Sequence, residues 1–255
     1  MTLGELERAL YEKFPRENQA SWDNTGLLVG DPARPVGRLL VSLDITEEVV
    51  DEAVRLHAGA ILSHHPVIFR PLHAVSPREN RVVWLLLQNG LGAVCMHTNL
   101  DTSPGGVGDS LAAALGLREV ERVMPDEENP RALFGRVGSV EECAPEAFCE
   151  RVKQALETPA LRAVCAPRPV RRVAVLGGSG KAYLAEAAAL ADAFVTADCG
   201  YHDFQTAASL GLTLIDAGHF PTENVVLPAL MCAAKAAFPD VDVLRSAHGD
   251  VIQFL

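Results

Sequence analysis

The sequence lacks the features that mark several specialised classes of protein. No segment reaches the roughly 18 consecutive apolar residues that a membrane-spanning helix needs, and no segment is of low complexity. The first 15 residues are typical of a capped amphipathic helix with charges throughout, without the apolar core of a signal peptide. We therefore expect a soluble, cytoplasmic protein with no membrane partner.

Positive charge is also scarce. The chain has 22 Lys and Arg residues against 33 Asp and Glu residues, which gives a formal net charge of −11. An acidic protein is a poor general binder of nucleic acid, because the phosphate backbone repels it. Nucleic acid stays open as a partner only if basic side chains such as Arg168, Arg171 and Arg172 line one face.

Paired cysteine motifs are missing as well. Six cysteines are present, but none form C-x-x-C, and a chain of 255 residues does not depend on disulfides for its core. We expect six thiols in a reducing compartment. Hydrophobic residues make up 49% of the chain, which is ordinary globular composition with room for one large or two modest domains.

Short apolar runs alternate with longer amphipathic runs along the chain. This alternation predicts an α/β fold with mostly parallel sheets. The predicted strands are 38–43, 59–63, 92–96, 132–140, 172–176, 193–196 and 212–216. The predicted helices are 46–57, 78–88, 110–115, 145–156, 181–190 and 204–210.

The rhythm of the first three strands recurs in the last three. We therefore predict two similar α/β halves, 1–124 and 125–255, joined through the polar, proline-bracketed segment 125–130. An old duplication and the shared physics of any βαβαβ unit both explain the recurrence, and the sequence does not distinguish them.

Histidines and carboxylates gather where predicted strands end, which is where open α/β sheets place their ligands. The six residues are His64, His65, His97, Asp101, His219 and Glu223. Adjacent side chains at a strand end diverge, so the His64–His65 pair can face two neighbouring ions, or one ion and solvent. The isolated histidines at 57, 73, 202 and 248 are more typical of ordinary hydrogen-bonded residues.

Six candidate ligands are too many for one catalytic ion, which needs about three from the protein. Two ions about 3.5–4 Å apart with a bridging carboxylate use such a set naturally. Imidazole and carboxylate donors favour Zn²⁺, Fe²⁺, Mn²⁺, Co²⁺ or Ni²⁺ over an all-oxygen Ca²⁺ site. The sequence therefore predicts a dinuclear metal site.

Three other motifs each have both a chemical and a structural explanation. Segment 177–181 resembles a P-loop but has Val175 and Ala182 where that motif needs Gly and Ser or Thr, which favours a structural turn. Segment 104–109 is either a phosphate cradle or a flexible helix entry. Cys199 and His202 are a weak nucleophile–base candidate, because loop neighbours at this spacing seldom have the required geometry.

Five motifs occur in an order that closely resembles the NIF-three-like dinuclear metal centre proteins, also labelled GTP cyclohydrolase I type 2 homologues. They are SWDNTGLLVG at 21–30, SHHPVIF at 63–69, HTNLD at 97–101, TADCGYH at 196–202 and DAGHFPTE at 216–223. The resemblance implies two α/β halves with a two-metal site in the cleft between them, and a toroidal homohexamer. It also implies that the metal ligands are His64, His65, Asp101, His219 and Glu223, with Glu223 as the bridge.

The function that we expect is metal-dependent hydrolysis of a small, nucleotide-like substrate, with GTP cyclohydrolase-like activity as one form of it. His97 and His202 are the candidate proton-transfer residues, because neutral imidazole titrates near working pH. His97 matches the histidine before the family's aspartate and is either a direct ligand or a residue that orients one. The alternatives are a non-catalytic metal-binding ring and a scaffold or regulatory ring.

Overall fold

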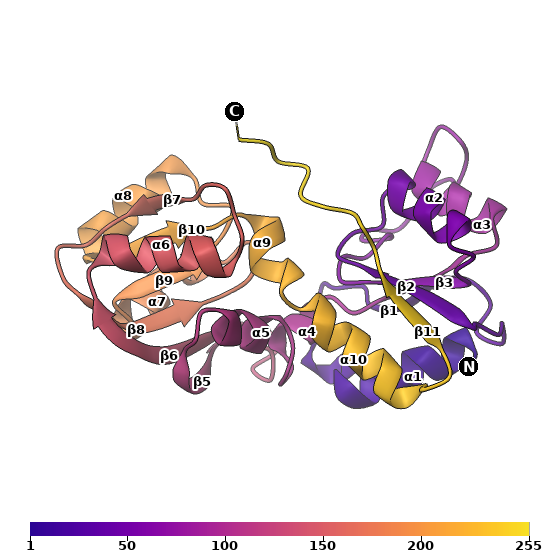
Figure 1. The fold of residues 1–255 in the computed structure, drawn as a ribbon, viewed down its shortest axis with the longest axis horizontal. Coiled ribbons are helices and arrows are strands. Elements are labelled where there is room, and N and C mark those ends of the chain that lie inside the picture. The colour runs from indigo at the N-terminus through magenta and orange to yellow at the C-terminus, as the bar shows by residue number, and fades with distance from the viewer. Residues whose placement is uncertain (255) are drawn as a thin grey trace. The chain divides into compact units, whose positions relative to one another are not determined.

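The computed structural model describes residues 1–254, which divide into two compact units. The first unit comprises 1–103 and 227–249, and the second comprises 104–226 and 250–254. The described chain contains no helix long and apolar enough to cross a membrane. Figure 1 labels most of the helices and strands of both units.

The first unit is built on a five-stranded sheet in the order β1-β4-β3-β2-β11. Its strands are β1 (Gly26–Val29), β2 (Arg38–Ser42), β3 (Ala60–Ser63), β4 (Gly92–Cys95) and β11 (Asp242–Arg245). Its helices are α1 (Leu3–Lys13), η1 (Arg16–Asn18), α2 (Glu47–Arg55), α3 (Arg81–Gln88), α4 (Thr98–Thr102) and α10 (Leu227–Ala237). Strands β11, β2, β3 and β4 pair in parallel, and β1 pairs antiparallel with β4.

Local sequence explains why these elements form. Thr46 caps α2 by accepting a hydrogen bond from the Val49 amide at 3.3 Å, as its position predicted. One sheet face packs against α2 and α3 in a core that includes Leu40 and Ile61. All four residues of β3 are buried, which is why this strand is an uninterrupted apolar run that ends in Ser63.

The second unit is built on a six-stranded sheet in the order β5-β6-β8-β9-β10-β7. Its strands are β5 (Arg118–Pro125), β6 (Leu133–Cys143), β7 (Arg162–Val164), β8 (Val170–Val175), β9 (Ala193–Thr196) and β10 (Thr213–Asp216). Its helices are α5 (Val107–Ala114), α6 (Pro145–Ala155), η2 (Lys181–Tyr183), α7 (Leu184–Leu190), α8 (Tyr201–Leu210) and α9 (His219–Asn224). Its core lies on both sheet faces, because alternate residues of β9 belong to different clusters: Val195 packs with α5 and α6, and Phe194 with α7 and α8.

The two units share one four-stranded arrangement. In the first, β1-β4-β3-β2 are neighbours in that order, and in the second, β7-β10-β9-β8 are neighbours in the same order. In each case three consecutive strands pair in parallel, and the strand that precedes them in the chain pairs antiparallel with the third. The predicted α/β class and the similarity of the two halves are confirmed at this level.

Three expectations need correction. The segment 125–130 does not join the units: it is the loop of a hairpin inside the second unit, since β5 and β6 pair antiparallel. The Asp126 carboxylate accepts hydrogen bonds from the amides of Glu128 and Asn129, which makes this polar, proline-bracketed stretch a turn. The hairpin also makes the second sheet mixed rather than mostly parallel, with two parallel and three antiparallel pairings among the described strands.

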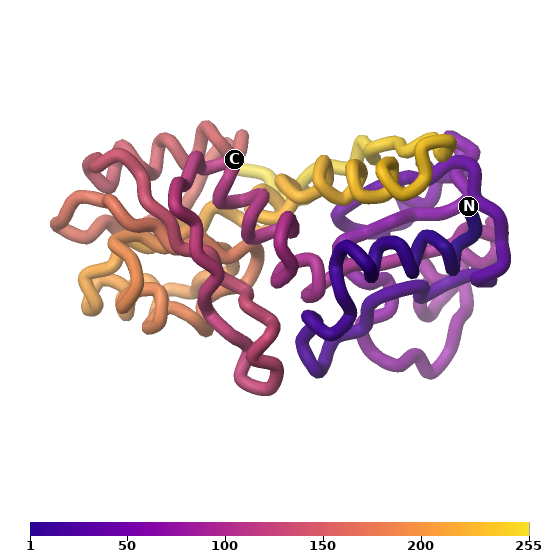
Figure 2. The backbone as a smooth tube through the Cα atoms, turned by 90° about the horizontal axis from the view of Figure 1, so that it is seen from below, coloured from indigo at the N-terminus to yellow at the C-terminus, as the bar shows by residue number. Residues whose placement is uncertain are grey.

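The predicted boundary after residue 124 also differs from the division that the structure shows. The chain enters the second unit at Pro104 and returns to the first at Leu227, where α10 packs against α1 and β11 pairs with β2. Figure 2 shows the yellow helix α10 back among the indigo and purple elements of the first unit. A short C-terminal strand whose partner lies some two hundred residues earlier leaves no local signal in the sequence.

Candidate metal centre

Three histidines of the first unit lie together at the carboxyl ends of two adjacent strands. His64 and His65 follow β3, and His97 follows β4, at the start of α4. Their ring centroids are separated by 4.8 Å (His64–His65), 5.3 Å (His64–His97) and 5.7 Å (His65–His97). One ring nitrogen from each lies within 4.8 Å of the other two, a spacing that can hold a metal ion. We call these three residues the histidine cluster.

Each imidazole of the histidine cluster is held through its Nδ1 atom. The Nδ1 of His65 lies 2.7 Å from Asp44 Oδ1, and the Nδ1 of His97 lies 2.7 Å from Asp23 Oδ1. The Nδ1 of His64 lies 3.0 Å from the carbonyl oxygen of Met96. Carboxylate and carbonyl oxygens only accept hydrogen bonds, so Nδ1 carries the proton in the neutral rings and Nε2 is the atom that could bind a metal ion.

The carboxylate of Asp101 belongs to the same group. Asp101 lies on α4, one helical turn after His97, and its Oδ1 is 3.5 Å from the Nε2 of His64. The His64 side chain is fully buried and that of Asp101 is largely so. A buried acid and a buried imidazole nitrogen at this separation form a mixed oxygen and nitrogen donor set, which suits a divalent transition metal.

Asp23 is the buried acid that holds the His97 ring of the histidine cluster. Its side chain is fully buried and accepts hydrogen bonds from His97, from the Thr98 amide at 2.9 Å and from the Thr98 hydroxyl at 2.5 Å. Burial alone would raise the pKa of Asp23, but these hydrogen bonds together hold it below its ordinary value. Asp23 therefore stays ionised and fixes the orientation of His97.

The second unit presents a smaller set of donors at the equivalent place. His219 begins α9 directly after β10, and Glu223 follows one turn later, so both side chains share one helix face. The His219 Nε2 lies 3.0 Å from Glu223 Oε2, and its Nδ1 lies 2.8 Å from Asp198 Oδ2. The hydrogen bond with Glu223, opposed by burial and supported by Asp198, raises the pKa of His219 to about 9.

The glycine loop after β8 brings backbone close to this acid. Gly178 has φ +63°, and a Cβ there would collide with Glu223 Oε1, so only glycine fits without displacing the carboxylate. The Gly178 amide donates to Thr222 Oγ1 at 3.0 Å, and the Gly180 amide donates to Thr196 Oγ1 at 2.9 Å. Both of these loop amides therefore donate to protein hydroxyl groups, which supports a structural turn over a phosphate-binding loop.

In the other glycine-rich segment, 104–109, a carboxylate of the segment itself accepts a hydrogen bond from a backbone amide. The Asp109 carboxylate accepts a hydrogen bond from the Gly105 amide at 2.6 Å and forms an ion pair with the fully buried Arg136. An anion at this helix entry would meet that carboxylate, so of the two alternatives for the segment the structural one is favoured.

Two residues predicted as chemical participants lie elsewhere. His202 is exposed on α8, where its Nδ1 lies 3.0 Å from Gln205 Oε1 and its ring contacts Tyr201. Cys199 is buried, and burial together with the nearby Asp216 carboxylate raises the pKa of its thiol to about 12. A thiol held neutral is a poor nucleophile, which argues further against Cys199 and His202 as a nucleophile–base pair.

The sequence pattern did not single out the residues that orient the histidines. Asp23, Asp44 and Asp198 each accept a hydrogen bond from a histidine Nδ1, and the partners are 74, 21 and 21 positions apart. A signal was present, because Asp44 and Asp198 also follow predicted strands at the edge where the histidines gather. Gly178 lies in the segment that resembles a P-loop, and nothing in that motif indicates its contact with Glu223.

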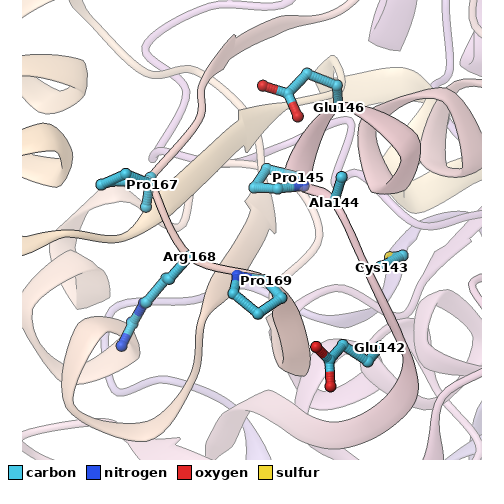
Figure 3. A pocket seen from close by; sticks show the side chains of 9 residues that line it. Glu142, Cys143, Ala144, Pro145, Glu146, Pro167, Arg168 and Pro169 are labelled. Atoms are coloured by element: carbon cyan, nitrogen blue, oxygen red, sulfur yellow. The ribbon is translucent and has the colours of Figure 1, made fainter.

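A cavity of about 550 Å³ in the second unit is separate from these donors. Figure 3 shows its walls, where Pro145, Pro167 and Pro169 lie around an opening with Glu142 and Glu146 at its edge. It contains none of the predicted ligands, and Glu142 is already paired with Arg171. It does not bear on the metal centre.

Two α/β sheets whose strand ends carry histidines and carboxylates define the class of protein. The chain belongs to the Duf34/NIF3 (NGG1p interacting factor 3) family, whose model matches residues 1–249. It is 39% identical over 231 residues to a GTP cyclohydrolase 1 type 2 homolog of Streptomyces coelicolor, covering 87% of this chain and 81% of the relative. A protein of the same name from Lactococcus lactis is 36% identical over 218 residues, covering 82% of this chain and 83% of the relative.

Solved structures agree with this assignment. A Bacillus cereus protein related to NIF3 matches with a TM-score of 0.93 at 26% identity, covering 100% of this chain and 99% of that one. A hypothetical protein from Staphylococcus aureus matches with a TM-score of 0.92 at 29% identity and the same coverage. The family and the two-sheet α/β fold that the motifs predicted are therefore confirmed.

Proposed function

We propose that this protein binds two divalent metal ions per chain. The observation that carries the proposal is the restraint on each candidate imidazole: all four have Nδ1 on an oxygen acceptor, at 2.7 to 3.0 Å. Metal-binding histidines almost always donate their second ring N–H in this way, because it fixes the tautomer and strengthens the ligand. The proposed ligands are His64, His65, Asp101, His219 and Glu223.

The donor chemistry fits such ions. Neutral imidazole and carboxylate groups suit Zn²⁺, Fe²⁺, Mn²⁺ or Ni²⁺, and availability decides among them as much as affinity. The Nε2 of His219 lies 3.0 Å from Glu223 Oε2, so a metal ion that binds this nitrogen would release a proton and separate the pair. Glu223 is the proposed bridging carboxylate.

His97 has a position of its own in this proposal. Its ring nitrogen is close enough to those of His64 and His65 to join one coordination sphere. Asp23 keeps the Nδ1 proton in place, so His97 offers Nε2 either as a ligand or as an acceptor for a substrate proton. Metal content of a His97→Ala variant distinguishes the two, because loss of an ion identifies a ligand.

We further propose that the protein hydrolyses a small, nucleotide-like molecule. Support comes from the name of the relatives, GTP cyclohydrolase 1 type 2 homolog, together with the mixed donor set. A pair of bound divalent ions supplies Lewis acidity and makes water more acidic. The chain's own contribution is to hold the imidazoles in one tautomer and to keep Asp23 ionised beneath His97.

Elemental analysis of protein purified without added metal tests the binding proposal. We expect about two ions per wild-type chain, and loss of both in Glu223→Ala if Glu223 bridges them. His202→Ala is the matched control, since His202 is an exposed histidine of the second unit with its own partner. Full occupancy in Glu223→Ala would remove Glu223 from the site.

The activity proposal needs a separate measurement. Metal-loaded protein should convert GTP or a related nucleotide, stop when a chelator is added, and recover with Mn²⁺, Zn²⁺ or Fe²⁺. Asp101→Asn should lose most of the rate with the fold intact, because an amide is a poorer ligand than a carboxylate. Protein that holds two ions and stays inert across a broad nucleotide screen would support a non-catalytic metal-binding function instead.

We also propose a homohexamer, on the basis of the family resemblance alone. Light scattering should report about six times the mass of one chain at micromolar concentration. A monomer under these conditions would exclude the ring.

A further inference from the structure

Two large aromatic side chains of the first unit remain in contact with solvent beside the histidine cluster. Trp22 is 57% exposed and Phe69 is 45% exposed. Their ring centroids lie 5.9 Å apart, and they lie 6.3 Å and 6.1 Å respectively from the ring of His97. Single exposed hydrophobic residues are common on proteins, but an aromatic pair in contact with a candidate metal ligand needs an explanation.

The three rings are nearly perpendicular to one another. The interplanar angles are 69° between Trp22 and Phe69, 72° between Trp22 and His97, and 89° between Phe69 and His97. Edge-to-face contacts of this kind use the edge of one ring and the face of the next, so the group holds its shape. The exposed surface of Trp22 and Phe69 is then available to a further ring.

Short hydrogen bonds hold both exposed residues in position. Asp23 follows Trp22 directly, and its buried carboxylate accepts hydrogen bonds from His97 and Thr98. Asn24 comes next, and its side-chain amide donates to the carbonyl oxygen of Ile68 at 2.5 Å, one residue before Phe69. The chain on either side of the aromatic pair is thus tied to the histidine cluster and to itself, which lowers the entropy cost of binding a ligand there.

The loop that carries Phe69 has the features of a binding loop. It runs from Pro66 to Asn80, between β3 and α3, without a helix or strand of its own. Loops of this length inside a compact unit are usually functional. A hollow of about 420 Å³ lies along it, lined in part by Phe69, Arg70 and His73.

We propose that Trp22 and Phe69 bind a planar heteroaromatic ring of the substrate, such as a purine base. This inference rests on the proposed function, since it places a nucleotide base next to the proposed metal ligands. Aromatic side chains bind bases by stacking against them, because every base presents a π-face. The ring is recognised by its face, and the remainder of the molecule extends towards the histidine cluster.

The intrinsic fluorescence of Trp22 tests this directly. The chain has two tryptophans, so Trp84→Phe leaves Trp22 as the single reporter. We expect saturable quenching of that reporter by guanosine 5′-monophosphate and none by ribose 5-phosphate, which carries the same phosphate without a base. Absence of saturable quenching, or equal quenching by the two compounds, would overturn the proposal.

Substitutions of Phe69 sharpen the test. In the same background, Phe69→Leu keeps apolar volume but loses the ring face, and it should raise the Kd for guanosine 5′-monophosphate by about tenfold. Phe69→Tyr should bind as the parent does. Tyr201→Ala, which removes an even more exposed aromatic residue from the second unit, is the control and should change nothing. An unchanged Kd in Phe69→Leu would contradict the proposal.

Two further comparisons separate this inference from the others. Titrations with and without chelator distinguish ring binding from metal binding. Quenching of Trp22 should persist after the chelator removes the metal. If protein that holds two ions shows no quenching, the ring-binding proposal is refuted while the metal-binding proposal stands. Light scattering of Phe69→Leu should match wild type. A change in mass would mean that Trp22 and Phe69 form a contact between copies of the chain, which also overturns the proposal.

Discussion

The Nδ1 of His65 lies 2.7 Å from Oδ1 of Asp44, so a residue at the end of one strand orients a candidate ligand at the end of the next. We predict that Asp44→Ala weakens metal binding by about 10- to 100-fold while the fold is retained, because His65 loses the acceptor that sets its tautomer. Isothermal titration with Zn²⁺ measures the change. Asp51→Ala removes an exposed acid from the neighbouring helix α2 and should bind as wild type does.

The second prediction concerns the pH dependence of the metal-free protein. The pKa of His219 is raised to about 9, so the protonated ring stabilises the fold most fully below its ordinary pKa of 6.5. That contribution is lost as the pH rises through about 9. The difference in Tm between metal-free wild type and His219→Gln should therefore be larger at pH 6 than at pH 10. A difference that grows with pH would contradict the sign.

Metal should reverse this trend. A divalent ion binds the deprotonated imidazole, so the rise in Tm on adding Zn²⁺ should increase between pH 6 and pH 8. Loss of that increase in His219→Gln would be expected if His219 is a ligand. An equal increase in the variant would place the pH-dependent ligand elsewhere.

Thiol reactivity gives a third prediction. Cys165 and Cys232 are exposed, whereas Cys199 is buried with its thiol pKa raised to about 12. At pH 8 only roughly one Cys199 thiol in ten thousand is ionised. Ellman's reagent should therefore react rapidly with Cys165 and Cys232, and Cys199→Ser should leave the rapid phase unchanged. A rapid phase that shrinks in Cys199→Ser would restore this residue as a candidate nucleophile.

The fourth prediction concerns the buried ion pair between Arg136 and Asp109 in the second unit. Arg136 is fully buried and pairs with Asp109, so Asp109→Ala leaves a buried positive charge without that partner. We expect the free energy of unfolding to fall by about 3 kcal/mol, measured with urea. Replacing both residues, Asp109→Ala with Arg136→Met, should recover part of the loss, because the charge itself is then removed.

Sequence patterns predicted the central strands because those strands are buried on both faces. Segments such as 193–196 are continuous apolar runs, and β9 has those bounds. The edge strands were missed for the opposite reason: β7 and β11 are short, carry arginine and are largely exposed, so their identity depends on a neighbouring strand. The hairpin loop at 125–130 was mistaken for a linker because turns and linkers use the same residues.

The candidate site also has one part that the sequence predicts and one part that it does not. The ligand residues follow strands that local patterns predict, so His64, His65 and His97 could be grouped in advance. The acids that orient them could not, because a hydrogen bond between Asp23 and His97 depends on how a loop before β1 folds over α4. The exposure of Trp22 and Phe69 could not be predicted from the sequence either, because large aromatic residues are ordinarily assigned to the core.

The return of the chain to its first unit has a consequence for synthesis on the ribosome. Strand β2 is made early, but its outer edge pairs with β11, at residues 242–245. Until those residues emerge, a nascent chain exposes an unpaired edge while the whole of the second sheet is being made. Strand β11 thus completes a sheet whose other strands are made much earlier, and ribosome-bound chains stalled before residue 242 should be prone to edge-to-edge association.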